Sequence, residues 1–179
     1  MSVFVTVGTT LFKDLIKTVQ SKEILDELFN KGFKSLVIQY GKGDAPNVKH
    51  PSVNIESFAF ANSLSQYFHD TSLVISHGGA GSILEALRAG KKLIVVINRS
   101  LMHDHQTELA DELAKKGYLI CTGNLIYSMS YPIIKLYIQD CDGLLNELQK
   151  GEFANLSPFP PSEAVNPWLS ELDKFMGNV

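Results

Sequence analysis

The chain has 179 residues, of which 45% are hydrophobic and 20% are charged, and this profile predicts one soluble globular domain with a sizeable core. The net charge is −3 and the lysines and arginines form no dense cluster, which excludes the basic field that nucleic-acid binding requires. Cys121 and Cys141 fit neither a disulfide framework nor the spacing of metal ligands, so we expect reduced thiols in the cytosol. We expect neither a secretory signal nor a membrane-spanning helix.

Apolar, β-branched runs alternate with segments of helical periodicity from the first residues to about residue 121. In chain order, strands are expected at residues 3–7, 36–39, 53–58, 73–76, 93–97 and 119–121, and helices at 11–30, 62–69, 81–89 and 104–116. This alternation is typical of a mainly parallel sheet covered by helices on both faces. The sequence therefore predicts a Rossmann-like, doubly wound α/β domain.

The last third of the chain gives a weaker pattern. Residues 124–149 mix helical apolar spacing with a proline, and residues 153–167 are rich in proline and serine. Residues 167–176 predict a short amphipathic helix whose apolar side packs on the domain or offers a contact to a partner, and that side carries Trp168, Leu169, Leu172 and Phe175. We therefore divide the chain into a Rossmann-like domain at 1–150 and a proline-rich segment with a C-terminal helix at 151–179.

A glycine-rich turn joins the expected strand at 73–76 to the expected helix at 81–89, and it consists of His77, Gly78, Gly79, Ala80, Gly81 and Ser82. Glycines permit positive φ angles and let backbone N–H groups approach a ligand closely. The helix that follows presents unpaired N–H groups and the positive end of its dipole. The turn therefore predicts an anion site, with a phosphate as the expected guest.

The same residues also have purely structural interpretations. A tight strand-to-helix turn needs glycine even where nothing binds. Ser82 and Glu85 fit a capping box, with Ser82 as the N-cap and Glu85 at the third helical position. Asp104 fits the N-cap of the next helix, which leaves His105 and Gln106 in its exposed first turn.

The topology of a doubly wound sheet favours the functional interpretation, because turns after adjacent strands meet at the carboxyl ends, where ligands bind. Three polar turns are expected there, at Gly8-Thr9-Thr10, at 77–82 and at 98–106. A helix N-terminus contributes up to about 2 kcal/mol to anion binding, whereas micromolar affinity requires about 8 kcal/mol. Further groups must bind a ribose, base or sugar, and Glu85, His105 and Gln106 are candidates.

Other α/β enzyme classes do not fit these residues. A dinucleotide-binding site needs G-x-G-x-x-G after the first strand, where Gly8-Thr9-Thr10 stands. A P-loop needs Gly-Lys-Ser/Thr, and a hydrolase elbow needs glycines two residues either side of its serine, where Ser82 has Ala80 and Leu84. A metal site is not expected, because adjacent side chains at a helix start diverge; its candidate ligands would be His77, His103, Asp104 and His105.

Taken together, these motifs resemble the donor-binding half of GT-B glycosyltransferases of family 28. The resemblance covers most of residues 1–122 and rests on residues 73–82, Glu85-Ala86-Leu87, Gly90-Lys91 and Asp104-His105-Gln106. Residues 101–106 and 156–160 are also similar to a family of small cytosolic donor-binding subunits of the UDP-N-acetylglucosamine transferase that acts on dolichol diphosphate. Two departures are that His105 separates an Asp and a Gln that are adjacent in related signatures, and that Asn98 replaces a frequent proline.

The resemblance implies a role for each turn. The glycine turn with Ser82 would hold the UDP diphosphate, Glu85 the ribose hydroxyls, and Gln106 with His105 the sugar hydroxyls. The first turn would line the cleft, and Asn98 would belong to the UDP-sugar site. No metal or other cofactor is implied, since backbone donors would stabilise the leaving diphosphate. The general base is not identified; His77 and His105 are local candidates, and the partner is another source.

The implied reaction is inverting transfer of GlcNAc from UDP-GlcNAc to GlcNAc-diphosphodolichol, the second step of lipid-linked oligosaccharide synthesis for N-glycosylation. The implied partner is a membrane-anchored acceptor-binding subunit, which would recruit the chain to the cytosolic face of the endoplasmic reticulum. Two alternatives stay open at this point. One is a non-catalytic nucleotide-sugar sensor or adaptor, and the other is a self-sufficient transferase acting as a homodimer.

Overall fold

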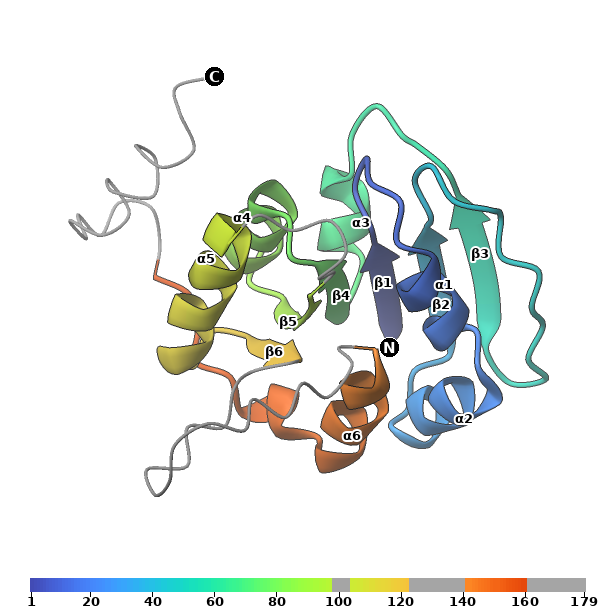
Figure 1. Ribbon diagram of the computed structural model, residues 1–179. Coiled ribbons are helices and arrows are strands. Elements are labelled where there is room, and N and C mark those ends of the chain that lie inside the picture. Colours follow the sequence, from blue (N-terminus) through green and yellow to red (C-terminus); the bar gives the residue numbers. More distant parts are fainter. Residues whose placement is uncertain (98–103, 123–140, 161–179) are drawn as a thin grey trace, which may run out of the picture.

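The computed structural model describes residues 1–97, 104–122 and 141–160, with only the backbone of 104–108 and 142. Its centre is a parallel sheet in the order β3-β2-β1-β4-β5-β6. The strands are β1 (Ser2–Thr6), β2 (Ser35–Gln39), β3 (Asn54–Phe58), β4 (Leu73–His77), β5 (Lys92–Val96) and β6 (Ile120–Thr122). The chain builds outward from β1 to β3, then returns to place β4 on the other side of β1 (Figure 1). This order confirms the predicted doubly wound fold and puts its switch point between β1 and β4.

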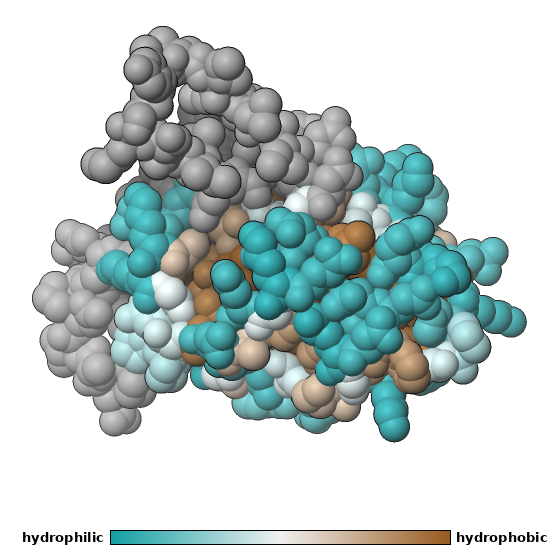
Figure 2. Space-filling model, turned by 90° about the horizontal axis from the view of Figure 1, so that it is seen from below, coloured by the Kyte–Doolittle hydropathy of each residue, from teal (hydrophilic) through white to brown (hydrophobic). Residues whose placement is uncertain are grey.

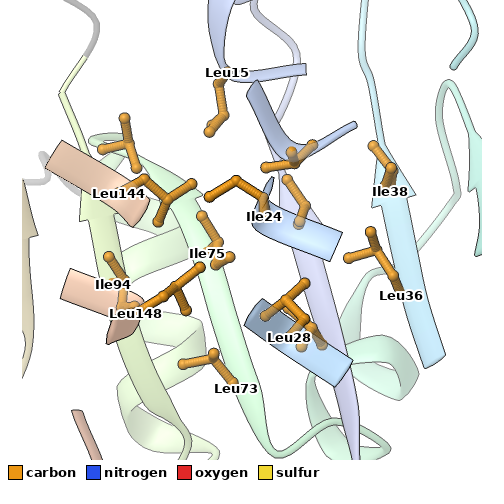
Figure 3. Close-up of a cluster of buried hydrophobic side chains, with 14 of the residues drawn as sticks. Leu15, Ile24, Leu28, Leu36, Ile38, Leu73, Ile75, Ile94, Leu144 and Leu148 are labelled. Carbon is orange, nitrogen blue, oxygen red and sulfur yellow. The ribbon is translucent and has the colours of Figure 1, made fainter. Parts of the chain in front are cut away.

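Helices cover both faces of the sheet. The helices are α1 (Lys13–Val19), α2 (Lys22–Asn30), α3 (Ser65–His69), α4 (Ala80–Arg88), α5 (Asp104–Lys115) and α6 (Asp142–Lys150), followed by the 3₁₀ turn η1 (Glu152–Asn155). Two buried clusters show which helices share a face. Leu15, Ile24 and Leu144 place α1, α2 and α6 over one face, and Figure 3 shows their side chains meeting those of β2, β4 and β5. Phe68, Ile83 and Leu113 place α3, α4 and α5 over the other.

The first helical segment differs from prediction, because residues 11–30 form two helices rather than one. The backbone of Ser21 is extended, with φ −66° and ψ 148°, and its hydroxyl accepts a hydrogen bond from the Ile24 N–H at 3.3 Å. The Gln20 side-chain amide donates to the Ile16 carbonyl at 2.8 Å. Capping of both ends by polar side chains allows the chain to break here while each helix keeps its own apolar side on the sheet.

Residues 151–160 pack against the body of the domain. Phe153 lies beside Phe33, with ring centroids 6.5 Å apart, in the α1, α2 and α6 layer. Phe159 makes an edge contact of 5.3 Å with Tyr118 in the opposite layer. Between them the Ser157 N–H donates to the Gly117 carbonyl at 2.9 Å. The segment therefore links the two layers; the predicted helix at 167–176, with Trp168, Leu169, Leu172 and Phe175, lies outside the described residues.

The surface is mainly hydrophilic on the side from which the strands start, with apolar side chains visible only in small patches (Figure 2). Within the described ranges, no helix is long and apolar enough to span a membrane. Cys121 and Cys141 form no disulfide and pack in different apolar layers, Cys121 with the α3, α4 and α5 layer and Cys141 with the other. The two sulfurs therefore face opposite sides of the sheet.

Candidate functional site

Two of the three predicted turns come together at the switch point. β1 and β4 are neighbouring parallel strands in which Thr6 lies opposite Ser76, so their carboxyl ends coincide. The turn after β1 contains Gly8, β4 ends at His77, and the side chain of His77 reaches the backbone of Gly8. The predicted convergence of these two turns is confirmed by this contact.

The imidazole of His77 fills the space between the two glycine turns. His77 is only 8% exposed, and its Nδ1 lies 3.4 Å from the Thr6 carbonyl oxygen. A Cβ added to Gly8 would lie 2.8 Å from Cε1 of this ring, and a Cβ added to Gly79 would meet Nε2 and lie 2.8 Å from Cε1. Both positions therefore require glycine because the ring occupies the volume of a side chain.

Backbone conformation explains only one of these glycines. Gly8 has φ +59°, in the left-handed region that glycine adopts without strain. Gly79 has φ −71°, which any residue adopts, so the expectation that the second turn needs glycine for positive φ is wrong at this position. At Gly79 the requirement is steric, and it comes from His77.

The first turn of α4 carries backbone donors without acceptors. α4 begins at Ala80 with Gly79 as its N-cap, and Gly79 has no side chain to cap the helix. The Ile83 N–H donates to the Gly79 carbonyl at 3.1 Å, but no described residue accepts a hydrogen bond from the N–H groups of Ala80, Gly81 or Ser82. Such a helix start is suited to an anion. A Cβ on Gly81 would meet no heavy atom within 4 Å, so space for a ligand lies beside it.

The capping-box interpretation of Ser82 and Glu85 is wrong. Because α4 starts at Ala80, Ser82 lies inside the first turn and Glu85 lies one turn further along the helix. The strand β4 extends to His77, so only Gly78 and Gly79 separate strand from helix. Glu85 is exposed, and its carboxylate has no hydrogen-bond or ion-pair partner among the described residues. A capping role therefore does not account for its presence.

Glu85 lies in a groove between α3 and α4 with a volume of about 410 Å³. The groove is lined by Ser65, Phe68, His69, Gly81, Leu84, Glu85, Arg88 and Ala89. Gly81 belongs both to this groove and to the uncapped turn, so the groove continues from the anion site along α4. Glu85 is thus the carboxylate nearest in sequence to the uncapped N–H groups, and a hydroxylated ligand in the groove would meet it.

Gln39, at the end of β2, holds the loops around the site and was not singled out from the sequence as a functional residue. It is 2% exposed, and its amide nitrogen donates to the carbonyls of Gly8 and Ala59, both at 2.7 Å. Its amide oxygen accepts from the Thr6 hydroxyl at 2.6 Å, and that hydroxyl accepts from the Gly8 N–H at 3.1 Å. The sequence signal that could have identified Gln39 is the position of a polar residue at the end of an apolar strand.

The structure describes the side chains of some of the remaining predicted site residues and not those of others. Thr9 is exposed, and Thr10 anchors the first turn by donating its hydroxyl to the Val7 carbonyl at 2.8 Å. Asn98 lies outside the described residues, as do the side chains of His105 and Gln106, whose backbone belongs to the first turn of α5. Within the described ranges, no group of three or more His, Cys, Asp or Glu side chains is placed to hold a metal ion.

The electrostatics of the described part of the site centre on His77. Burial of the imidazole lowers its pKa, which a hydrogen bond to the Thr6 carbonyl only partly offsets. The ring is therefore neutral at pH 7. An uncapped helix start, a neutral buried imidazole and an unpartnered carboxylate together can bind a phosphorylated, hydroxyl-bearing ligand.

Comparison with known proteins gives a consistent assignment. Residues 2–124 match the model of a family described as the glycosyltransferase family 28 C-terminal domain. The human UDP-N-acetylglucosamine transferase subunit ALG13 is 45% identical over 125 residues, which cover 67% of this chain and 11% of the human protein. The subunit of the same name from Saccharomyces cerevisiae is 31% identical, covering 96% of this chain and 93% of the yeast protein. The chain thus spans about a tenth of the human relative and nearly all of the yeast one.

Solved structures share the fold. The solution NMR structure of ALG13 superimposes with a TM-score of 0.65 and 29% identity, covering 96% of this chain and 94% of that chain. The crystal structure of the glycotransferase of kitacinnamycin gives a TM-score of 0.56 at 17% identity, covering 95% of this chain and 36% of that chain. The chain therefore shares the fold of both structures, and it spans nearly all of the ALG13 chain and about a third of the larger glycotransferase.

Proposed function

The chain belongs to the glycosyltransferase family 28 C-terminal domain family, and from this premise we propose that it is the donor-binding subunit of a UDP-N-acetylglucosamine transferase. The proposed reaction transfers GlcNAc from UDP-GlcNAc to GlcNAc-diphosphodolichol with inversion, forming a β-1,4 bond and releasing UDP. The observation that carries the proposal is the uncapped first turn of α4 at the switch point, with Glu85 one turn further along the same helix.

The binding roles follow from this arrangement. The N–H groups of Ala80, Gly81 and Ser82 would donate to the diphosphate and stabilise the charge that develops on it as the sugar leaves. The carboxylate of Glu85 would accept hydrogen bonds from the ribose hydroxyls, with the nucleoside in the groove between α3 and α4. We assign no metal, because backbone donors take the role of neutralising the leaving group.

The sugar and the cleft would involve the other two turns. We propose that Gln106 with His105 and Asn98 contacts the GlcNAc hydroxyls, and that Gly8, Thr9 and Thr10 line the cleft. His77 is poorly placed to act as the general base, because its ring is buried between two glycines. The base would then be His105 or a group of the acceptor-binding partner, beside the acceptor hydroxyl.

A partner is part of the proposal, because the relatives of this chain are named as subunits of a UDP-N-acetylglucosamine transferase. We propose a membrane-anchored acceptor-binding subunit that holds the chain at the cytosolic face of the endoplasmic reticulum. The C-terminal segment with Trp168, Leu169, Leu172 and Phe175 is the proposed contact. Deleting residues from 167 onward should abolish co-purification with that subunit, and unchanged co-purification would contradict this contact.

The test is to co-express the chain with candidate membrane subunits and to measure synthesis of lipid-linked chitobiose from UDP-GlcNAc. Glu85→Gln should raise the KM for UDP-GlcNAc by about tenfold or more, since an ionised acceptor of two hydroxyls contributes about 1.5–3 kcal/mol. The matched control is Glu23→Gln, an exposed carboxylate in the first turn of α2, which should leave KM unchanged.

Three outcomes would each contradict a part of the proposal. A KM insensitive to Glu85→Gln would remove the ribose role. Binding of UDP-GlcNAc without transfer in the presence of every candidate partner would favour a sensor or adaptor. Robust transfer by the purified single chain would instead contradict the requirement for a partner.

A further inference from the structure

His77 brings a second, independent feature to the anion site at the start of α4. The Thr6 carbonyl can only accept a hydrogen bond, so the Nδ1 atom that lies 3.4 Å from it carries the ring proton. In the neutral ring Nε2 then carries a lone pair. No described residue donates a hydrogen bond to Nε2, although His77 is only 8% exposed. In the part of the chain that the structure describes, this buried acceptor therefore lacks a donor.

The position of Nε2 relates it to the uncapped turn. A Cβ on Gly79 would meet Nε2, so this atom lies against the residue that directly precedes Ala80 and its free N–H group. An anion bound by the N–H groups of Ala80, Gly81 and Ser82 would therefore lie beside an imidazole edge that carries a lone pair. A lone pair and an anion repel each other, whereas an imidazolium N–H donates to the anion.

Among the described residues, the surroundings contain no group that would hold a proton on His77 in the free protein. From β1 the ring faces the Thr6 carbonyl and Gly8, from the start of α4 it faces Gly79, and on β5 the residue opposite His77 is Val96. Within the described residues, no charged side chain contributes to its pKa, and burial lowers that pKa. A nearby diphosphate would act in the opposite direction, because opposite charge favours the protonated ring.

We propose that His77 takes up one proton from solvent when the diphosphate of the donor binds the first turn of α4, so that the neutral imidazole becomes an imidazolium paired with the diphosphate. The step moves one proton from water to Nε2 and forms or breaks no other covalent bond. It rests on the proposed function, since it takes a sugar nucleotide as the ligand. Because the complex then holds more protons than the free protein, donor affinity falls as pH rises, by up to about tenfold per pH unit.

The experiment measures proton uptake and the state of the ring directly. Calorimetry of UDP-GlcNAc binding to the full chain, at about pH 7 in two buffers of different ionisation enthalpy, should show uptake of about half to one proton. UDP-GlcNAc is the probe because its diphosphate is a diester with no proton that titrates near neutral pH, unlike UDP. Imidazole ¹⁵N NMR of the same samples should show His77 as the neutral Nδ1–H form alone and as the imidazolium in the complex.

Two variants test whether the proton taken up on binding resides on His77. His77→Asn, whose amide can still donate to Thr6, should abolish the uptake and flatten the pH dependence of affinity. His50→Gln is the matched control, because His50 pairs with Asp26 on α2 at 3.0 Å and lies in no part of the proposed site, so the uptake should persist. If His77→Asn does not fold, the ¹⁵N spectra of the wild-type chain decide the question.

The outcomes separate this inference from the proposed function. Binding of UDP-GlcNAc with His77 neutral throughout, or an uptake that persists in His77→Asn, would overturn the inference alone. Absence of binding at millimolar UDP-GlcNAc, with unchanged amide shifts at Ala80, Gly81 and Ser82, would overturn the proposed function and this inference with it.

Discussion

Replacing Gly79 with alanine would place a methyl group in space that the imidazole of His77 already occupies. The new Cβ would lie 2.8 Å from Cε1 and closer still to Nε2, well inside ordinary carbon contact distance. Movement of the ring towards β1 is limited, because the ring already occupies the position beside Gly8 where a side chain would begin. Overpacking of this kind costs about 1–3 kcal/mol, and with both sides blocked we expect about 3 kcal/mol. At an m-value of about 2 kcal/mol/M, the urea midpoint should fall by about 1.5 M.

Two further variants isolate the cause. Gly81→Ala adds the same methyl in the same helical turn where no heavy atom lies within 4 Å, so it should raise the free energy of unfolding, by up to about 1 kcal/mol. In a His77→Ala background the ring is absent, and Gly79→Ala should then cost less than about 0.5 kcal/mol. Urea unfolding followed by far-UV circular dichroism measures all the variants. A Gly79→Ala protein as stable as wild type, or an equal penalty without His77, would refute the steric explanation.

Three further predictions concern stability and local opening. Gln39→Leu leaves the part-buried Gly8 carbonyl without its donor and removes one of the two donors to the Ala59 carbonyl, which keeps the Gly41 N–H. The free energy of unfolding should therefore fall by about 2 kcal/mol in urea; a loss below about 1 kcal/mol would contradict the role of Gln39. His77 is held neutral by burial, so the unfolded chain binds the proton more tightly, and stability should fall as pH drops below 6.5. Between about pH 7.5 and about pH 5.5, the free energy of unfolding should fall less for His77→Asn than for the wild-type chain. Equal falls in the two proteins would contradict this role of His77. Lys92→Met removes the 2.9 Å hydrogen bond that the Lys92 ammonium donates to the Leu156 carbonyl. In hydrogen-exchange NMR, the Ser157 amide should then exchange about tenfold faster. Unchanged exchange would show that residues 151–160 are held by other contacts.

Much of the fold could be predicted because it depends on short-range patterns. Apolar β-branched runs specify buried strands without reference to the rest of the chain, and all six expected strands are present with ends displaced by at most one residue. The break at Ser21 was missed because apolar spacing continues across it. The helix α6 lies where proline and mixed spacing had weakened the pattern.

The candidate site, like the fold, could be predicted only in part from the sequence. The turn from His77 to Ser82 could be recognised because glycines between a strand and a helix are adjacent in sequence. The start of α4 was misplaced because Ser82 and Glu85 have the spacing of a capping box, and only the extent of β4 excludes it.

Three-dimensional contacts decided what the sequence by itself left open. The bonds of Gln39 join residues that are 20 to 33 positions apart, and the ring of His77 lies against Gly8 although 69 positions separate them. The sequence determined the alternation of strands and helices, the glycine turn and the family to which the chain belongs. Only the tertiary structure decided why Gly8 and Gly79 must be glycine and which donors stay free, because the space around a residue is filled by side chains from distant parts of the chain.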